Sequence, residues 1–241
     1  MYLWEEFNIK TFPAETIVFR DGFFQKELST IRSPQFITNN QQSIIININK
    51  FYRLPIHIIY IDETRNQNNL EIHISNSDDQ QLMTVDRRVF LTAKLQNKNP
   101  AFLNVFIKNT GENSRFKGKI LCQNFSTLEA KVCGRHLEKN TGIIIETKII
   151  AHSKSFTKLT GAAEVEKNCT DCDSDISFST LAASDAKIEF FPAQFIRATP
   201  LAAEHSAYIY KGTKAQTEYL REAGLSGEEV KEALTEAFIN S

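Results

Sequence analysis

The sequence lacks long apolar segments and an excess of either charge. Its longest unbroken apolar runs are four residues, among them Ile58 to Ile61 and Ala207 to Tyr210, whereas a membrane-spanning helix needs about 20. The 28 Lys and Arg residues almost balance the 29 Asp and Glu residues, which leaves a net charge of -1. No overall positive field therefore attracts phosphates or an anionic membrane. We expect a soluble protein whose partners are neither nucleic acid nor membrane.

Export signals and a cysteine framework are also missing. The segment from Met1 to Glu6 has no basic region followed by an apolar stretch, so the sequence predicts a cytoplasmic protein. Four cysteines in 241 residues are too few for a disulfide scaffold. In a reducing compartment we expect Cys122, Cys133, Cys169 and Cys172 to be thiols, ligands or nucleophiles.

Between about residues 17 and 210, apolar residues recur with a period of two. This period is typical of strands that bury one face. The spacing of the strands admits a sandwich, a barrel or a β-solenoid, and the pattern does not choose among them. The segments with this period are 17–19, 44–48, 56–60, 70–74, 103–107, 143–145, 176–178 and 188–190, with further candidates at 128–132 and 147–151.

Glycine and proline are scarce for so much β structure, at nine and six residues. The turns must therefore be made largely by Asn, Asp, Ser and Lys, as in segments 66–69 and 109–113. Pro55 begins one apolar segment and Pro192 interrupts another. Because proline cannot donate to a β ladder, these two segments are predicted to be sheet edges or strand starts.

The pattern changes to helical after Tyr210. Segments 213–216 and 226–229 both read as capping boxes, and Gly224 is predicted to end the first helix. In the second helix, apolar residues fall at i, i+3, i+4, i+7 and i+8 from Val230. Two short amphipathic helices are not stable alone, so their apolar faces must dock on the β body or on another protein.

Cysteine and histidine are the residue types that could carry chemistry. Cys169 and Cys172 form a CxxC pair, which supplies two metal ligands or a dithiol. With Cys133 and His136 they could complete a Cys3His zinc site, while the plainer interpretation makes Cys122 and Cys133 core thiols.

His205 follows Glu204, and an imidazole beside a carboxylate can bind a metal or move a proton. Neighbours on a strand point to opposite faces, however, so the two need not act together. No motif for a catalytic nucleophile with its base, a zinc protease or a nucleotide-binding loop is present.

Several blocks of the sequence resemble one family. Segments 19–29 and 55–61 resemble the start of the core domain of the SufB/SufD family of iron-sulfur cluster assembly proteins of the SUF system. In the last third, segments 160–165, 172–175, 186–189, 204–207 and 219–226 are similar to family blocks in the same order.

The resemblance implies a right-handed parallel β-helix, a β-solenoid, capped by two short C-terminal helices. It divides the chain into a β-helix core, 1–210, and a C-terminal helical segment, 211–241. In the family the terminal helices bind the SufC ATPase, and two β-helix subunits pair through their sheets. The resemblance thus implies a SufC-like ATPase and a SufB/SufD-like partner, or a second copy, as partners of this chain.

The resemblance also assigns roles to residues. Cys172 corresponds to the cysteine that SufB-type scaffolds use for sulfur or an iron-sulfur cluster, and His205 to a histidine near the subunit interface. Glu204 and Cys169 are added as candidates from their positions beside these two. The ATPase-binding residues it implies are Tyr219, Leu220, Leu225, Val230 and Leu234.

Three features separate this chain from the larger SufB-type members. It has no long N-terminal region, so it resembles a minimal core. Ser206 follows His205 where SufB-type scaffolds have a glutamate, which is closer to SufD-type members. The segment 190–204 is longer than usual. These features favour a SufD-like or minimal-system subunit that completes its site with another chain.

The leading hypothesis is therefore a non-enzymatic scaffold subunit that carries a transient iron-sulfur cluster, with ATP hydrolysed by its partner. One alternative is a β-solenoid that binds or cleaves polysaccharide. Another is a β protein stapled by zinc, with no role in cluster assembly. Metal analysis of cysteine variants separates the zinc alternative from the other two.

Overall fold

Strands occupy most of the chain, and two helices follow them. The computed structural model describes residues 15–20, 23–24, 36–38, 43–48, 56–62, 67–75, 88–200 and 202–241. The helices are α1 (Lys214–Glu222) and α2 (Gly227–Asn240). The strands are β1 (Glu15–Arg20), β2 (Phe23–Phe24), β3 (Phe36–Thr38), β4 (Ser43–Ile48), β5 (Ile56–Asp62), β6 (Gln67–Ser75), β7 (Arg88–Asn97), β8 (Ala101–Thr110), β9 (Arg115–Asn124), β10 (Thr127–His136), β11 (Gly142–Ala151), β12 (Phe156–Val165), β13 (Asp173–Ala182), β14 (Lys187–Ile196) and β15 (Ala202–Tyr210).

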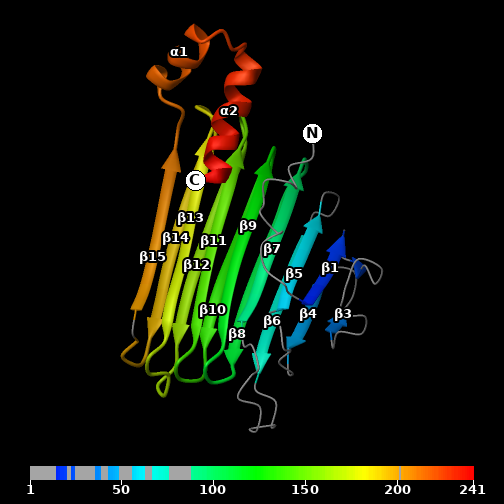
Figure 1. Ribbon diagram of the computed structural model, residues 1–241, viewed down its shortest axis with the longest axis vertical. Helices are drawn as coiled ribbons and strands as arrows, with labels where there is room; N and C mark the ends of the chain where they lie inside the picture. Colours follow the sequence, from blue (N-terminus) through cyan, green and yellow to red (C-terminus); the bar gives the residue numbers. More distant parts are fainter. Residues whose placement is uncertain are drawn as a thin grey trace.

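The strands form a parallel β-solenoid, as the resemblance implied. Among the described residues, sheet A has the order β15-β13-β11-β9-β7-β5-β1-β2 and sheet B the order β14-β12-β10-β8-β6-β4-β3. From β4 to β15, each strand pairs in parallel with the strand two places further along the chain. The two sheets therefore face each other in successive turns of one coil (Figure 1). This arrangement excludes the closed barrel and the antiparallel sandwich that the periodicity left open.

The core lies between the two sheets and is built from stacked rows of side chains. Strands β12 and β13 alternate strictly between buried and half-buried residues. Parallel pairing without offset places Ile145 beside Ile176, so like positions of successive turns stack on one another. Phe116 and Phe178 are among the largest fully buried side chains. Burial of each such side chain contributes about 1.5–3 kcal/mol, which stabilises the coil turn by turn.

Asparagine makes some of the turns, as predicted. Asn113 and Asn140 have φ of 63° and 52°, in the left-handed region that asparagine tolerates. A buried Asn97 side chain donates to the Asn124 side chain of the next turn at 2.9 Å, so the corners also stack. The turn predicted at 66–69 is wrong in part, because β6 already begins at Gln67.

Proline marks a sheet edge and a strand start. β14, which contains Pro192, is the last strand of sheet B, and β5 begins directly after Pro55. Both outcomes confirm the expectation from the missing N–H group. The apolar segments 143–145 and 147–151 both belong to one strand, β11.

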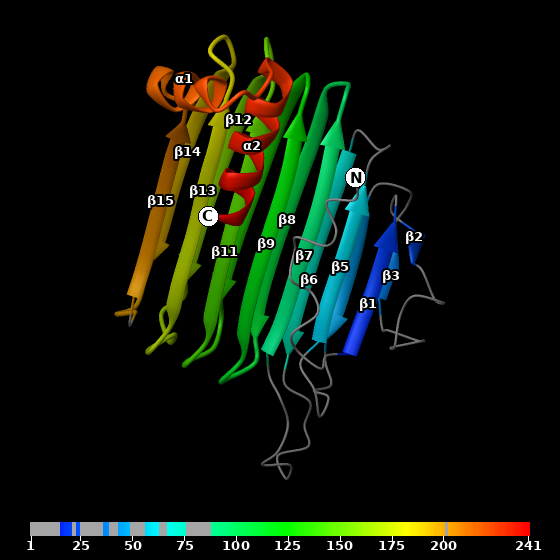
Figure 2. The same ribbon diagram turned by 45° about the horizontal axis from the view of Figure 1, so that its top comes forward.

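The two C-terminal helices begin where the capping boxes predicted. Thr213 and Ser226 each accept from the backbone of the third residue after them, with the reciprocal bond also present. The chain leaves α1 through Gly224, whose φ is 94°. Figure 2 shows α2 lying against the strands of sheet A and α1 beyond the strand ends. Within the described part of the chain, neither helix is long and apolar enough to cross a membrane.

Candidate functional site

Cys172 lies at the start of β13, inside the last turns of the solenoid. Its thiol is fully buried. The sulfur lies 3.3 Å from the Thr141 hydroxyl oxygen, and the thiol has the backbone carbonyl of Glu138 at 3.3 Å as an acceptor. Ala198, on the connection from β14 to β15, packs against the small cluster that contains Cys172, Cys169 and Val165. The thiol thus lies against backbone carbonyls, in a cluster that a residue of the β14–β15 connection also packs against.

His136 is connected to Cys172 through Thr141. The Thr141 hydroxyl oxygen lies 2.7 Å from His136 Nδ1 and also has the Glu138 carbonyl at 3.0 Å. His136 is fully buried, and its Nε2 atom has no hydrogen-bond partner among the described residues. Burial, followed by the positive charge of Arg115, lowers the pKa of His136 to about 4. The imidazole is therefore neutral at pH 7, and its Nδ1 shares a hydrogen bond with the Thr141 hydroxyl.

Cys169 lies beside Cys172 in the same buried cluster. Its thiol donates to the backbone carbonyl of His136 at 3.2 Å. The turn between the two cysteines passes through Asp171, whose φ is 57°. Burial raises the pKa of Cys169 to about 11, with a smaller contribution from Cys172. The CxxC segment thus folds so that both of its side chains enter one buried cluster.

His205 occupies an inward position on the last strand of sheet A. It pairs with Ile176 of β13 and comes so close to Gly161 of β12 that a Cβ atom there would lie 2.7 Å from His205 Nε2. Both ring nitrogens are without a partner among the described residues. Burial lowers the pKa of His205, while the nearby Asp175 carboxylate opposes that shift. His205 therefore lies at the end of the solenoid with no hydrogen bond from either ring nitrogen to a described residue.

Within one chain the structure does not bring Cys172 and His205 together. His205 pairs with Ile176, four residues beyond Cys172 along the strand, which corresponds to roughly 13 Å at the strand rise. Glu204 is exposed and points to the opposite face from His205. Among the described residues, no group of three or more His, Cys, Asp or Glu side chains could hold a metal ion. Cys172 and Cys169 form one pair, and His205 lies apart from it.

The other two cysteines differ from each other. Cys122 is buried in the core, as predicted, and burial raises its pKa to about 12. The same prediction is wrong for Cys133, which lies half-buried on the outward face of β10, with its thiol 4.0 Å from Glu164 Oε1. Because Cys133 and His136 are three residues apart on one strand, they point to opposite faces. The zinc set proposed from the sequence is therefore not assembled.

Comparison with protein families matches residues 87–238 to the family described as SUF system FeS cluster assembly, SufBD core domain. The match covers more than half of the chain. This chain belongs to the SufB/SufD family. A comparison with curated proteins gave no match. Membership supports a role in iron-sulfur cluster assembly by the SUF system, and the members of this family are assembly subunits rather than known enzymes.

The last turn of this SufBD core domain carries exposed apolar side chains. β14 and β15 end their sheets, and six large side chains on them are between 37% and 56% exposed. On β14 these are Phe191, Phe195 and Ile196; on β15 they are Tyr208, Ile209 and Tyr210. We call this set, with the two free strand edges, the terminal edge.

The helices of the domain differ in how they pack. No residue of α1, which the structure describes in full, is buried, and Tyr219 is 72% exposed. Leu220 and Leu225 are half-buried. In α2, Val230 is buried, and Phe238 and Ile239 pack with Leu121 and Ile150 on the outer face of sheet A. The five residues implied as ATPase contacts thus include an exposed aromatic ring on α1 and a valine already buried on α2.

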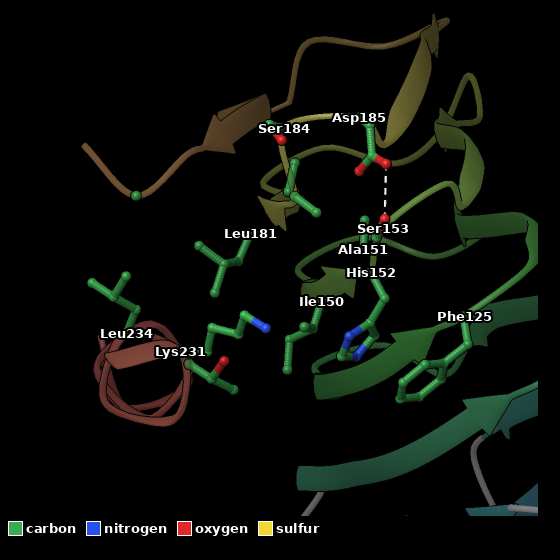
Figure 3. Close-up of a pocket in the computed structure, with 14 residues that line it drawn as sticks. Phe125, Ile150, Ala151, His152, Ser153, Leu181, Ser184, Asp185, Lys231 and Leu234 are labelled. Atoms are coloured by element: carbon green, nitrogen blue, oxygen red, sulfur yellow. Dashed lines mark hydrogen bonds between the residues drawn. The ribbon is translucent and has the colours of Figure 1, made fainter. Parts of the chain in front are cut away.

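A cavity of about 740 Å³ separates the first half of α2 from the ends of the strands (Figure 3). Leu234 and Lys231 line it from α2, and Leu181 lines it from β13. On the opposite wall, the His152 ring stacks on Phe125 with centroids 3.7 Å apart. The last part of α2 thus packs on sheet A, while Leu234, which is half-buried, lines the cavity.

The sequence does not reveal the contacts of Thr141 with Cys172 and His136. In the sequence, His136 stands out only as a possible zinc ligand, because it follows Cys133 by three residues. Thr141 carries no sequence signal at all, since it meets Cys172 only through the stacking of one turn on the next.

Proposed function

We propose that this chain is a non-enzymatic scaffold or partner subunit of a SUF-type assembly complex, paired with a second β-helix subunit through the terminal edge. The exposed apolar side chains on two free strand edges are the observation that carries this proposal. Free edges with exposed aromatic residues are sites where further strands add. The second subunit is another copy or a SufB/SufD-like relative.

The C-terminal helices bind a SufC-like ATPase, which hydrolyses ATP for the complex. The exposure of α1 and of the Tyr219 ring supports this assignment, because a docking segment must leave its contact residues free. The contact with the ATPase extends from Tyr219 to Leu220, Leu225 and Leu234. Val230 is buried, so its contribution requires α2 to move away from sheet A.

Cys172 accepts sulfur or ligates the cluster that is being assembled, which is the cargo of the complex. Thiolates are the usual ligands of iron-sulfur clusters. His205, on the terminal edge, contributes from the subunit contact, with Glu204 and Cys169 as neighbours. Because Cys172 and His205 are separated along the strand, one chain does not supply both to one atom. This separation, with Ser206 after His205, favours a SufD-like or minimal-system subunit that shares its site with another chain.

Pairing is tested by measuring molecular mass in solution with Phe195→Asp and Ile209→Asp combined, for the chain alone and with its β-helix partner. The double variant is expected to remain monomeric because it places two carboxylates on the terminal edge. Phe102→Asp is the matched control, since Phe102 is 49% exposed but lies on β8, in the middle of sheet B. A folded double variant that still pairs like the control would disprove the proposed interface.

ATPase binding is tested by pull-down with Tyr219→Asp combined with Leu234→Asp. Capture of the ATPase should be lost in the double variant and retained in Phe102→Asp. Undiminished capture by a folded double variant would reject the helices as the docking element.

The cluster role is tested by anaerobic reconstitution with iron and sulfide, with and without the ATPase, followed by visible absorption. Wild type should develop cluster absorption, and Cys172→Ser should lose it. Cys133→Ser is the control, because that thiol lies on the outer face of β10. Absence of a cluster in every combination would leave the chain a companion without a cluster-bearing role.

A further inference from the structure

The Cys169 and Cys172 side chains are both fully buried and pack in one small cluster. The turn that joins them is fixed by the Cys169 N–H donating to the Glu166 carbonyl at 3.0 Å and by the Asn140 N–H donating to the Thr170 carbonyl at 2.9 Å. Two thiols that share one cluster and one short turn form a disulfide where their Cα atoms lie within about 7 Å of each other.

The sulfur of Cys172 is also in contact with Thr141. The Thr141 hydroxyl lies between the sulfur of Cys172 and Nδ1 of His136. It donates to the backbone carbonyl of Glu138 at 3.0 Å. Because the hydroxyl contacts all three groups, it positions the thiol of Cys172.

We propose that Cys169 and Cys172 form a two-electron dithiol site that reduces sulfane sulfur to sulfide, with Cys169 as the resolving thiol. This inference rests on the proposed function in one respect, that Cys172 is the residue that accepts sulfur. It adds the redox step that turns accepted sulfur into the sulfide that a cluster requires.

The first step transfers sulfur to Cys172. The thiolate of Cys172 attacks the outer sulfur of a persulfide donor, R–S–SH. A bond forms between Cys172 Sγ and that sulfur, the donor S–S bond breaks, and the donor leaves as a thiolate that takes up the proton of the Cys172 thiol. The product is a persulfide on Cys172.

The second step releases sulfide. Cys169 attacks Cys172 Sγ, the Cys169–Cys172 disulfide forms, and the outer sulfur leaves with the bonding electron pair and the Cys169 proton as hydrogen sulfide. The two thiols lose two electrons and the sulfane sulfur gains them. A second dithiol, supplied from outside, reduces the disulfide for another turnover.

Both cysteine side chains are fully buried, and Ala198 packs against their cluster. Burial also keeps Cys169 protonated by raising its pKa. A donor therefore reaches Cys172 only when the packing around the pair loosens.

The test uses the full reduced chain under anaerobic conditions, alone and with the ATPase and ATP, with glutathione persulfide as the donor. Released sulfide is measured with time, and the peptide containing both cysteines is analysed by mass spectrometry after alkylation. Wild type should release sulfide and acquire the disulfide. Cys169→Ser should retain one added sulfur atom on Cys172 and release sulfide at least about tenfold more slowly.

The outcomes separate this inference from the proposed function. A wild type that holds a stable persulfide on Cys172, with Cys169→Ser behaving alike, overturns the resolving role and leaves the acceptor role intact. A Cys172 that takes up no sulfur under any condition overturns both. Cys133→Ser is the control, and Cys169→Ala provides a second variant if Cys169→Ser does not fold.

A second measurement needs no sulfur donor. Incubation in a dithiothreitol redox buffer, followed by acid quenching and alkylation, should show a disulfide between Cys169 and Cys172. Failure of this disulfide to form at any buffer ratio in which the chain remains folded overturns the dithiol site.

Thr141 is a positioning residue in this scheme, and its role has its own readout. Thr141→Val should slow persulfide formation on Cys172 without changing the equilibrium amount of disulfide in the redox buffer, and Thr141→Ser should restore the rate. Equal slowing by Thr141→Val and Thr141→Ser would contradict the positioning role of the Thr141 hydroxyl.

Discussion

The ammonium group of Lys148 on β11 donates to the backbone carbonyl of Phe238 at 3.0 Å, and to that of Ile239 at 3.1 Å. The last carbonyls of a helix have no partner within the helix and carry its negative end. Lys148 itself is buried on the outer face of sheet A, where Glu146 lies 3.4 Å away. One lysine therefore fastens the end of α2 to the solenoid.

Lys148→Met should loosen α2 from sheet A. The substitution removes the lysine donor from both carbonyls, although the Phe238 carbonyl keeps the Ser241 hydroxyl as a donor at 2.9 Å. We expect a loss of about 1–3 kcal/mol in the free energy of unfolding, together with faster amide exchange in 227–240. Lys119→Met is the control, because Lys119 pairs with the same Glu146 but is 53% exposed, and such a surface pair contributes less than about 1 kcal/mol. Unchanged exchange in α2 would show that Lys148 does not hold the helix.

Gly161→Ala should destabilise the last turns and displace His205. The new Cβ would lie 2.6 Å from Phe178 and 2.7 Å from His205 Nε2. Forcing such contacts apart costs about 1–3 kcal/mol, which a lowered midpoint of urea unfolding would reveal. Gly227→Ala serves for comparison, since nothing lies within 4 Å of a Cβ there. Equal midpoints for the two variants would mean that the space around His205 adapts freely.

His136 should make the fold less stable as the pH falls below 6.5. Its folded pKa is about 4, whereas the value for the free side chain is 6.5, so between these pH values the unfolded chain binds the extra proton. The free energy of unfolding should therefore decrease by up to roughly 3 kcal/mol from pH 6.5 to 4. This part of the decrease should be missing in His136→Asn, measured by urea unfolding at each pH. Parallel pH profiles for the two proteins would contradict the assignment.

Asn124→Ala should weaken the stacked corners. The Asn124 side chain accepts from Asn97 at 2.9 Å and donates to the Thr157 hydroxyl at 2.7 Å and to the Phe156 carbonyl at 2.9 Å. Its loss leaves buried groups unsatisfied, so we expect a decrease of about 2–4 kcal/mol in the free energy of unfolding. Gln123→Ala, on the same strand but the opposite face, should change it by less than about 0.5 kcal/mol. A similar effect of both substitutions would show that the hydrogen bonds of Asn124 do not stabilise the stacked corners.

Some strands of the solenoid could not be found from their sequence. β12 places Thr157, Gly161 and Ala163 at inward positions, and none of these is a strong apolar signal. They fit because larger side chains, such as Phe178, fill the same space from the facing sheet. A short strand of small residues is therefore a consequence of its neighbours, which period-two patterning does not reveal.

The candidate site, too, could be predicted from the sequence only in part. The sequence alone marked Cys169 and Cys172 as a pair, since a CxxC spacing is visible without a structure. It could not place Thr141 or His136 beside Cys172, because these contacts depend on how one turn of the coil stacks on the next.

The sequence by itself determined the local elements: strands by alternation, both helix starts by their capping boxes, and the edge position of β14 by Pro192. The periodicity left the architecture open, and the family resemblance implied the solenoid that the tertiary structure shows. Only the tertiary structure decided that α2 packs on sheet A while no residue of α1 is buried, and that Cys172 lies apart from His205. The physical reason is the separation along the sequence over which each interaction acts. Capping and alternation act within a few residues, whereas the stacking that positions the thiols joins residues some 30 positions apart.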